Sequence, residues 1–218
     1  MSKVIVVDGG PRKKWNTAQL LDQAAQDAQE AGAEVERFRL FDLDVKDCYA
    51  CMACKRVDNK TNGLCAMRDD LRTVLEACYN ADGIIVGTPI YYSNLTAQTC
   101  AFLCRLMFPL MHYQNDGFHP IERNKHFGLI MTMNAAEENL DKIGYRARYD
   151  AYAHGIGTFL GEGETLYCCN TLQFDDYSKY YAGLFDEEAK KAHHAEQFPK
   201  DLQAAHNMGA RAATGAGK

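Results

Sequence analysis

Short apolar runs alternate along the chain with longer stretches in which apolar residues recur every third or fourth position. The short runs are rich in Val, Ile and Leu, which is typical of strands buried on both faces of a sheet. They predict five strands, at residues 3–7, 35–40, 83–86, 126–132 and 165–169. The amphipathic stretches predict helices at residues 17–31, 71–79, 96–110 and 143–160, and two final helices at 185–195 and 200–213.

Strand and helix alternate five times, which indicates an α/β fold with a doubly wound, five-stranded parallel sheet. The 218 residues are expected to form a single domain, residues 1–218. A cysteine-rich loop excursion at 45–70 is expected to interrupt it, and a C-terminal extension at 170–218 to end it. Ligands of such sheets bind beyond the carboxyl ends of the strands, so the loops after the first, third and fourth strands are the places to inspect.

Charge and cysteine content narrow the classes of function. The net charge of −5 argues against a general nucleic-acid binder, which needs a basic face. No apolar run is long enough for a signal peptide or a membrane span, so we expect a cytoplasmic protein without a membrane partner. In that reducing compartment the nine cysteines are expected to be thiols or metal ligands.

The loop after the first strand has the features of a phosphate site. It reads Gly-Gly-Pro-Arg-Lys-Lys-Trp-Asn-Thr over residues 9–17 and leads directly into a helix. Its glycines permit a tight turn, and Asn16 or Thr17 can cap the helix. Free amides at the helix start and the nearby Arg12 would attract an anion, and the absence of a Gly-Lys-Ser/Thr sequence favours a single terminal phosphate. The alternative is a plain capped turn with solvated lysines.

The loop after the third strand offers flat aromatic surfaces. It reads Thr-Pro-Ile-Tyr-Tyr-Ser-Asn over residues 88–94. Pro89 stiffens the turn, and Tyr91 and Tyr92 could flank a planar heterocycle while backbone amides bond its polar edge. The alternative is that the two tyrosines belong to the core or to a partner surface.

Together these two loops resemble the NADPH-dependent FMN reductase-like family of the flavodoxin superfamily, over roughly residues 3 to 133. The resemblance implies a flavodoxin-like fold and FMN as the cofactor. It also implies that Gly10, Arg12, Asn16 and Thr17 hold the phosphate, and that the ring is lined by Thr88, Pro89, Ile90, Tyr91, Tyr92 and Asn94. Residues 132–134, with Asn134 at their end, form a third wall. Two positions depart from the family pattern: Gly10 replaces the usual serine, and Trp15 lies where glycine is common.

The second candidate site is a group of four cysteines. Cys48, Cys51 and Cys54 form a C-x-x-C-x-x-C motif, and Cys65 follows after ten intervening residues. Such thiolates can hold a [4Fe–4S] cluster or a tetrahedral zinc, and the third interpretation is a loop of free thiols. The arrangement resembles that of the iron–sulfur flavoproteins, a subgroup of the same family in which a Gly-x-Cys and an Asp-Asp pair follow the compact motif. Because this loop is expected to leave the sheet on the carboxyl side, a cluster could lie near the ring of its own chain or of a neighbouring subunit.

Other polar and aromatic groups receive simpler interpretations. Cys100 and Cys104, four residues apart on a predicted helix, could touch a cluster or form a redox pair, but a packed helix face is the simpler interpretation. Cys168 and Cys169 are spaced for opposite faces of a strand. The charged stretch 186–191 predicts a solvated helix face, and the aromatic stretch 174–181 suggests contact with a partner subunit.

The main functional hypothesis is therefore an NAD(P)H-dependent FMN oxidoreductase of the flavin or quinone reductase type. It would be a homo-oligomer, a dimer or tetramer, that passes electrons to a small-molecule or protein acceptor. Because the flavin supplies the chemistry, no side chain is assigned as a catalytic acid or base. The alternatives are an electron carrier that relays single electrons through FMN and a cluster without nicotinamide turnover, and a redox sensor whose cysteines report oxidation.

Overall fold

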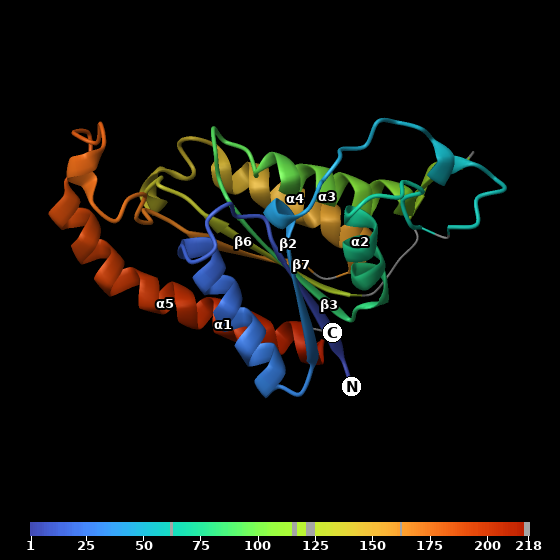
Figure 1. Ribbon diagram of the computed structural model, residues 1–218, viewed down its shortest axis with the longest axis horizontal. Helices are drawn as coiled ribbons and strands as arrows, with labels where there is room; N and C mark the ends of the chain where they lie inside the picture. The colour runs from blue at the N-terminus through green and yellow to red at the C-terminus, as the bar shows by residue number, and fades with distance from the viewer. Residues whose placement is uncertain (62, 115–116, 121–124, 162, 216–218) are drawn as a thin grey trace.

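The computed structural model describes residues 1–61, 63–114, 117–120, 125–161 and 163–215. At its centre five parallel strands lie in the order β2-β1-β3-β6-β7. They are β1 (Lys3–Asp8), β2 (Glu34–Arg39), β3 (Gly83–Pro89), β6 (His126–Thr132) and β7 (Gly163–Cys168). This arrangement confirms the predicted five-stranded, doubly wound parallel sheet (Figure 1).

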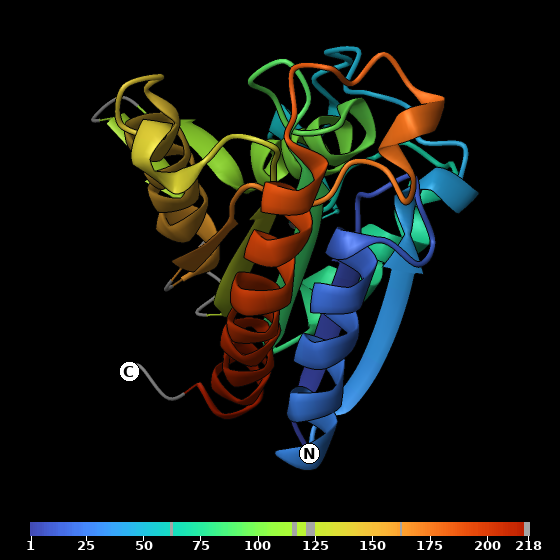
Figure 2. The same ribbon diagram turned by 90° about the vertical axis from the view of Figure 1, so that its left-hand side faces the viewer.

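Helices cover both faces of the sheet. α1 (Asn16–Glu30) and α5 (Glu187–Thr214) lie side by side on one face, while α2 (Leu71–Asn80), α3 (Ala97–Met107) and α4 (Tyr145–Leu160) cover the other (Figures 1 and 2). Alternate residues of each strand pack into two separate cores, because successive side chains point to opposite faces. Cys168 and Cys169 accordingly lie in different cores, which confirms their predicted placement on opposite faces.

The strand order reverses at β1, which has β2 on one side and β3 on the other. The connections that follow β1 and β3 therefore diverge and leave a crevice at the carboxyl edge of the sheet. The chain fits tightly there: the Gly9 amide donates to the Gly87 carbonyl at 2.8 Å, and the Thr96 hydroxyl donates to the Gly9 carbonyl at 2.8 Å. A Cβ at Gly9 would lie 1.9 Å from the Thr99 hydroxyl, so no larger residue fits.

The C-terminal residues form one long helix, whereas the sequence predicted two. Pro199 lies inside α5 and has no N–H to donate to the preceding turn. Packing against α1 stabilises the helix across this defect, since Phe198 and Ala205 on either side of Pro199 are buried. The two helices approach closely at Gly209, where a Cβ would lie 2.1 Å from the Ala24 carbonyl oxygen.

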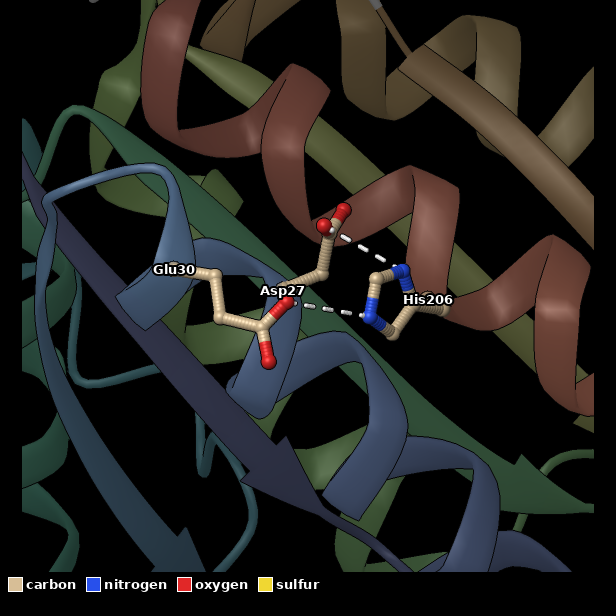
Figure 3. Close-up of side chains that lie close together, drawn as sticks. All are labelled: Asp27, Glu30 and His206. Carbon is tan, nitrogen blue, oxygen red and sulfur yellow. Dashed lines mark ion pairs between the residues drawn. The ribbon is translucent and has the colours of Figure 1, made fainter.

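An ionic contact joins the same two helices near their ends. Figure 3 shows His206 of α5 between the carboxylates of Asp27 and Glu30 of α1. The Nδ1 and Nε2 atoms of His206 lie 3.2 Å and 3.5 Å from an oxygen of Asp27 and of Glu30, respectively. The second oxygen of Asp27 accepts from the Ala210 amide at 2.6 Å, so α1 and α5 are held together by polar as well as apolar contacts.

The sequence did not predict the antiparallel hairpin of β4 (Met111–Gln114) and β5 (Gly117–Pro120). Its strands are four residues long and lack an apolar run, so they leave no clear signal. Five short 3₁₀ turns complete the described part of the chain: η1 (Leu40–Asp42), η2 (Ala53–Lys55), η3 (Phe108–Leu110), η4 (Glu137–Asn139) and η5 (Tyr177–Lys179). None of the helices among the described residues has the length and apolar character needed to cross a membrane.

Candidate functional site

The loops after β1, β3, β6 and β7 line one pocket at the carboxyl edge of the sheet. It contains eight of the eleven residues predicted to contact the cofactor: Gly10, Arg12, Asn16, Thr17, Pro89, Ile90, Tyr91 and Asn134. Thr132 and Met133 of the expected third wall are also there. The pocket further includes Pro11, Trp15, Thr171, Leu172 and Gln173, which the sequence analysis did not assign to it.

Three predicted contact residues lie outside the residues that line the pocket. Thr88 is completely buried, and its hydroxyl accepts from the Thr96 amide at 3.2 Å. Tyr92 is fully exposed, with a φ of 47° in a tight turn that Tyr91 and Asn94 close through reciprocal backbone hydrogen bonds. The Asn94 side chain accepts from Arg148 at 2.8 Å. These contacts shape the loop that presents Tyr91.

The start of α1 has no side-chain cap, and the predicted capping by Asn16 or Thr17 is wrong. Trp15 occupies the cap position, and no side chain there accepts a hydrogen bond from the helix. The side-chain amide of Asn16 instead donates to the Leu172 carbonyl at 2.8 Å, and the Thr17 hydroxyl forms a hydrogen bond with the Thr132 hydroxyl at 2.8 Å. An uncapped helix start with no acidic residue in its first turn suits an anion, because its amides and dipole are not offset.

Arg12 adds a fixed positive charge to this end of the pocket. Its guanidinium lies 4.3 Å from the centre of the Trp15 ring and donates to the Gln173 carbonyl at 2.7 Å. Burial lowers the pKa of Arg12, but an arginine remains protonated. Trp15 in turn donates to the Leu172 carbonyl at 2.9 Å.

The segment after β7 is thus part of the site, and sequence reasoning missed it. The available signal was topological: parallel strands all end at the same edge, so the loop after the fifth strand belongs there as much as the loops after the first, third and fourth. The part that lines the pocket, residues 171–173, contains no glycine or aromatic residue, and the aromatic stretch 174–181 that follows it was interpreted as a partner contact.

A buried carboxylate anchors the loop after β1 from below. Asp8 is completely buried, and its oxygens accept from the Gly10 amide at 2.9 Å, from Arg37 at 3.1 Å and from Arg39 at 3.3 Å. The Gly10 amide is therefore already used. A phosphate in this pocket would have to be held by Arg12 and the start of α1.

The four predicted ligand cysteines line a second cavity, together with Tyr49, Met52, Ala66, Met67, Arg105, Phe108 and Pro109. Cys54 and Cys65 are buried, and Cys51 is exposed. Ala50 and Met52, which alternate with the cysteines, have left-handed φ values of 56° and 55°. Such strained backbone persists only where the surroundings require it, and it is common at binding sites.

The spacing of the sulfurs does not match a zinc site. Tetrahedral zinc with bonds of about 2.3 Å places its thiolates about 3.8 Å apart. Within the described residues, no three cysteine sulfurs lie within 4.8 Å of one another.

Arg105 is the buried cation of this cavity. Its guanidinium makes two hydrogen bonds to Asp69, at 2.5 and 2.8 Å, and one to the Lys46 carbonyl at 2.9 Å, while its buried Nε has no hydrogen-bond partner among the residues that the structure describes. Hydrogen bonds from Arg105 lower the pKa of Asp69. The hydrogen bonds to Asp69 and, after them, the nearby Cys65 raise the pKa of Arg105, which places the cation near a predicted ligand.

The cysteine cavity lies away from the first pocket, so of the two expected placements the one beside the ring of the same chain is not supported, and the one beside a neighbouring subunit's ring stays a prediction. Thr96 at the start of α3 contacts the loop after β1, whereas Phe108 and Pro109 beyond its end line the cysteine cavity. Twelve residues of helix span about 18 Å. Figure 1 shows the reason: the cyan segment after η1 runs along the helical layer to the opposite end of the molecule.

The sequence model of the NADPH-dependent FMN reductase family matches residues 2–138, so the chain belongs to this family of FMN-dependent oxidoreductases. An iron–sulfur flavoprotein of Archaeoglobus fulgidus is 29% identical over 168 residues, covering 73% of this chain and 71% of the relative. Another alignment to an iron–sulfur flavoprotein of that organism has 37% identity over 94 residues, and spans 43% of each chain. An iron–sulfur flavoprotein of Methanosarcina thermophila is 34% identical over 103 residues, 47% of this chain and 51% of the relative. Most of these matches thus span about half the length of the curated relatives.

Solved structures show the same fold at low sequence identity. An NAD(P)H:quinone oxidoreductase from Methanothermobacter marburgensis superposes with a TM-score of 0.69 at 15% identity, covering 96% of this chain and 98% of the other. An FMN-dependent NADH-azoreductase from Bacillus anthracis, solved in complex with FMN, gives a TM-score of 0.65 at 13% identity, covering 96% and 100%.

Proposed function

We propose that this chain is an FMN-dependent oxidoreductase that takes electrons from reduced nicotinamide and passes them to a quinone-type small molecule or a protein acceptor. The observation that carries the proposal is the pocket at the strand-order reversal, where an uncapped helix start and Arg12 face loops bearing Tyr91 and Asn134. Because the chain belongs to the FMN reductase family, FMN is the ligand that we assign to this pocket.

The two ends of the pocket have different tasks. Arg12, Asn16, Thr17 and the first-turn amides of α1 hold the phosphate, and Pro89, Ile90, Tyr91 and Asn134 position the ring. The bound flavin supplies the electron-transfer chemistry, and the protein supplies its position and electrostatic surroundings.

A phosphate-specific binding test distinguishes this proposal from a capped turn. Asn16→Ala combined with Thr17→Ala should weaken FMN far more than riboflavin, which has no phosphate, because each lost charge-assisted bond costs about 1.5–3 kcal/mol. Equal losses for both ligands would place the phosphate elsewhere. Oxidation of NADH and NADPH by the FMN-loaded protein in the presence of a quinone then tests the activity.

A second function, electron relay through a [4Fe–4S] cluster, is favoured by the four cysteines that line one cavity beside Arg105. Protein made anaerobically should then carry about four iron and four sulfide per chain beside one FMN. Cys51→Ser should abolish the iron and keep the flavin, whereas Cys100→Ser, outside the cavity lining, should keep both. Anaerobic protein with full FMN and no iron would refute the cluster and leave the reductase proposal standing.

We also propose a cytoplasmic homo-oligomer. All nine cysteines are free, as suits a reducing compartment. Tyr180, Tyr181 and Leu184, which lie within or just beyond the predicted contact stretch, expose large apolar surfaces. Analytical ultracentrifugation of the wild type and of Tyr181→Ser with Leu184→Ser tests this: a dimer or tetramer that the variant weakens supports it, and a wild-type monomer contradicts it.

A further inference from the structure

Lys190 of α5 is a buried cation beside the candidate flavin pocket. The sequence predicted a solvated helix face here. The position of Lys191 matches this prediction, since Lys191 pairs with Glu187 at 2.8 Å on the surface. The position of Lys190 contradicts the prediction, because only 5% of this residue is exposed. Its ammonium group reaches inward, to the loops that follow β6 and β7.

The partners of this ammonium group are neutral. Its Nζ donates to the side-chain oxygens of Asn134 and Asn170, each at 2.7 Å, and to the Asn170 carbonyl at 3.4 Å. Within the described parts of the chain, none of the ion pairs includes a carboxylate bound to Lys190. Burial lowers the pKa of Lys190, and no neighbouring acid offsets this effect. A buried charge without a counter-charge is costly, so the site suits a ligand that brings a negative charge.

Lys190 also fixes which way the Asn134 amide points. An ammonium group only donates hydrogen bonds, so the oxygen of Asn134 must face Lys190 and its NH₂ group must point elsewhere. Asn134 lines the pocket, so its NH₂ group is available there as a donor. Backbone bonds from Asn170 to Ala135, at 2.8 Å, and from Thr171 to Met133, at 3.0 Å, hold the two loops together around the amide.

The position of Asn134 indicates which part of FMN is involved. The phosphate site is at the end of β1, and Asn134 follows β6, two strands away in the sheet. β6 pairs directly with β3, and the Ile90 amide of the tyrosine-bearing loop donates to the Thr132 carbonyl at 2.9 Å. Asn134 therefore lies beside the loop that presents Tyr91, which assigns its amide to the ring end of the pocket.

We propose that Lys190 is a positioning residue for the flavin ring, which holds Asn134 as a hydrogen-bond donor and stabilises the reduced ring relative to the oxidised ring by its positive charge. This inference rests on the proposed function. Hydride transfer from a nicotinamide adds two electrons and one proton to the neutral oxidised ring, so the reduced ring carries one negative charge until a second proton arrives. The nicotinamide would lose these two electrons with the hydride and would leave in its oxidised form. The positive charge of Lys190 would offset this negative charge of the reduced ring.

The test compares oxidised and reduced flavin binding in matched variants. Lys190→Gln removes the charge and keeps a donor for the asparagine oxygens, and Lys190→Arg keeps the charge. Lys191→Gln makes the same change on the exposed neighbour. Asn134→Asp is an independent variant that leaves Lys190 in place and gives it a counter-charge. The readouts are the dissociation constants of oxidised and reduced FMN and riboflavin, and the reduction potential of the bound flavin.

For Lys190→Gln and Asn134→Asp we expect the ratio of the reduced to the oxidised dissociation constant to rise at least tenfold. That change corresponds to a potential about 30 mV lower for a two-electron couple. Lys191→Gln should leave the ratio unchanged, and Lys190→Arg should change it less than threefold. Equal weakening of both redox forms would show a purely structural role, and an effect on FMN but not on riboflavin would assign the charge to the phosphate. Either result overturns the inference. A wild-type protein that binds no flavin would refute the proposed function itself.

Discussion

The Asp69–Arg105 pair allows a quantitative prediction, because the chain also contains an exposed Arg–Asp pair joined by two hydrogen bonds. Arg105 is completely buried and Asp69 nearly so, and two hydrogen bonds of 2.5 and 2.8 Å join them. Asp69→Asn would leave the Arg105 charge buried without its counter-ion. Breaking a buried pair in this way costs about 3–5 kcal/mol, a large part of the typical stability of a domain.

The matched control is Asp58→Asn. Arg56 and Asp58 also form two hydrogen bonds, each of 2.8 Å, but both side chains are exposed. Water and salt screen such a pair, so this variant should be hardly less stable than the wild type.

The assay is urea unfolding of the three proteins as a function of pH. Hydrogen bonds from Arg105 lower the pKa of Asp69 in the folded state, so ionised Asp69 stabilises the fold. This contribution is complete above the pKa of the unfolded chain, about 3.9, and is lost as the pH falls through the lower folded-state pKa. The difference between wild type and Asp69→Asn should therefore be full at pH 7 and shrink only below about pH 4. Equal stability of Asp69→Asn and Asp58→Asn at pH 7 would refute this reasoning.

Two further predictions concern packing and the flavin loop. Gly209→Ala should destabilise the fold by about 2 kcal/mol or more in urea unfolding, because the added Cβ meets the Ala24 carbonyl. Gly155→Ala, in α4 with no atom within 4 Å of the added Cβ, should instead stabilise it by up to about 1 kcal/mol, and the reverse order would contradict the close α1–α5 approach. Tyr91→Ala should change the absorbance of bound flavin, while Tyr92→Ala should not, since only Tyr91 lines the pocket. Identical spectra for wild type and Tyr91→Ala would place this tyrosine away from the ring.

The sequence predicted the sheet because buried parallel strands leave a strong local signal of β-branched residues. It predicted most of the pocket because the loops after β1 and β3 carry recognisable glycine, proline and tyrosine positions. What it missed depends on contacts between distant segments. Nothing local in the 186–191 stretch distinguishes Lys190 from Lys191; only the packing of α5 against the sheet buries the first and exposes the second.

Contacts between distant segments also explain why the sequence predicted two final helices instead of one and did not predict the course of the cysteine loop. Pro199 is a strong local signal for a helix end, but the energy of packing against α1 outweighs it. The four cysteines were recognised from their spacing, yet the direction in which their loop runs along α3 is a property of the folded chain. For that reason the spacing could indicate that the four cysteines group together, but not where their cavity lies relative to the flavin loops.

The most direct test of the central claim is an anaerobic titration of the apoprotein with FMN, followed by addition of NADH or NADPH. We expect saturation at one FMN per chain, and then loss of the oxidised flavin absorbance on addition of at least one of the two nicotinamides. The pocket should bind riboflavin more weakly, by the contribution of the phosphate. A chain that binds neither flavin, or a bound FMN that neither nicotinamide reduces, would contradict the assignment as an NAD(P)H-dependent FMN oxidoreductase.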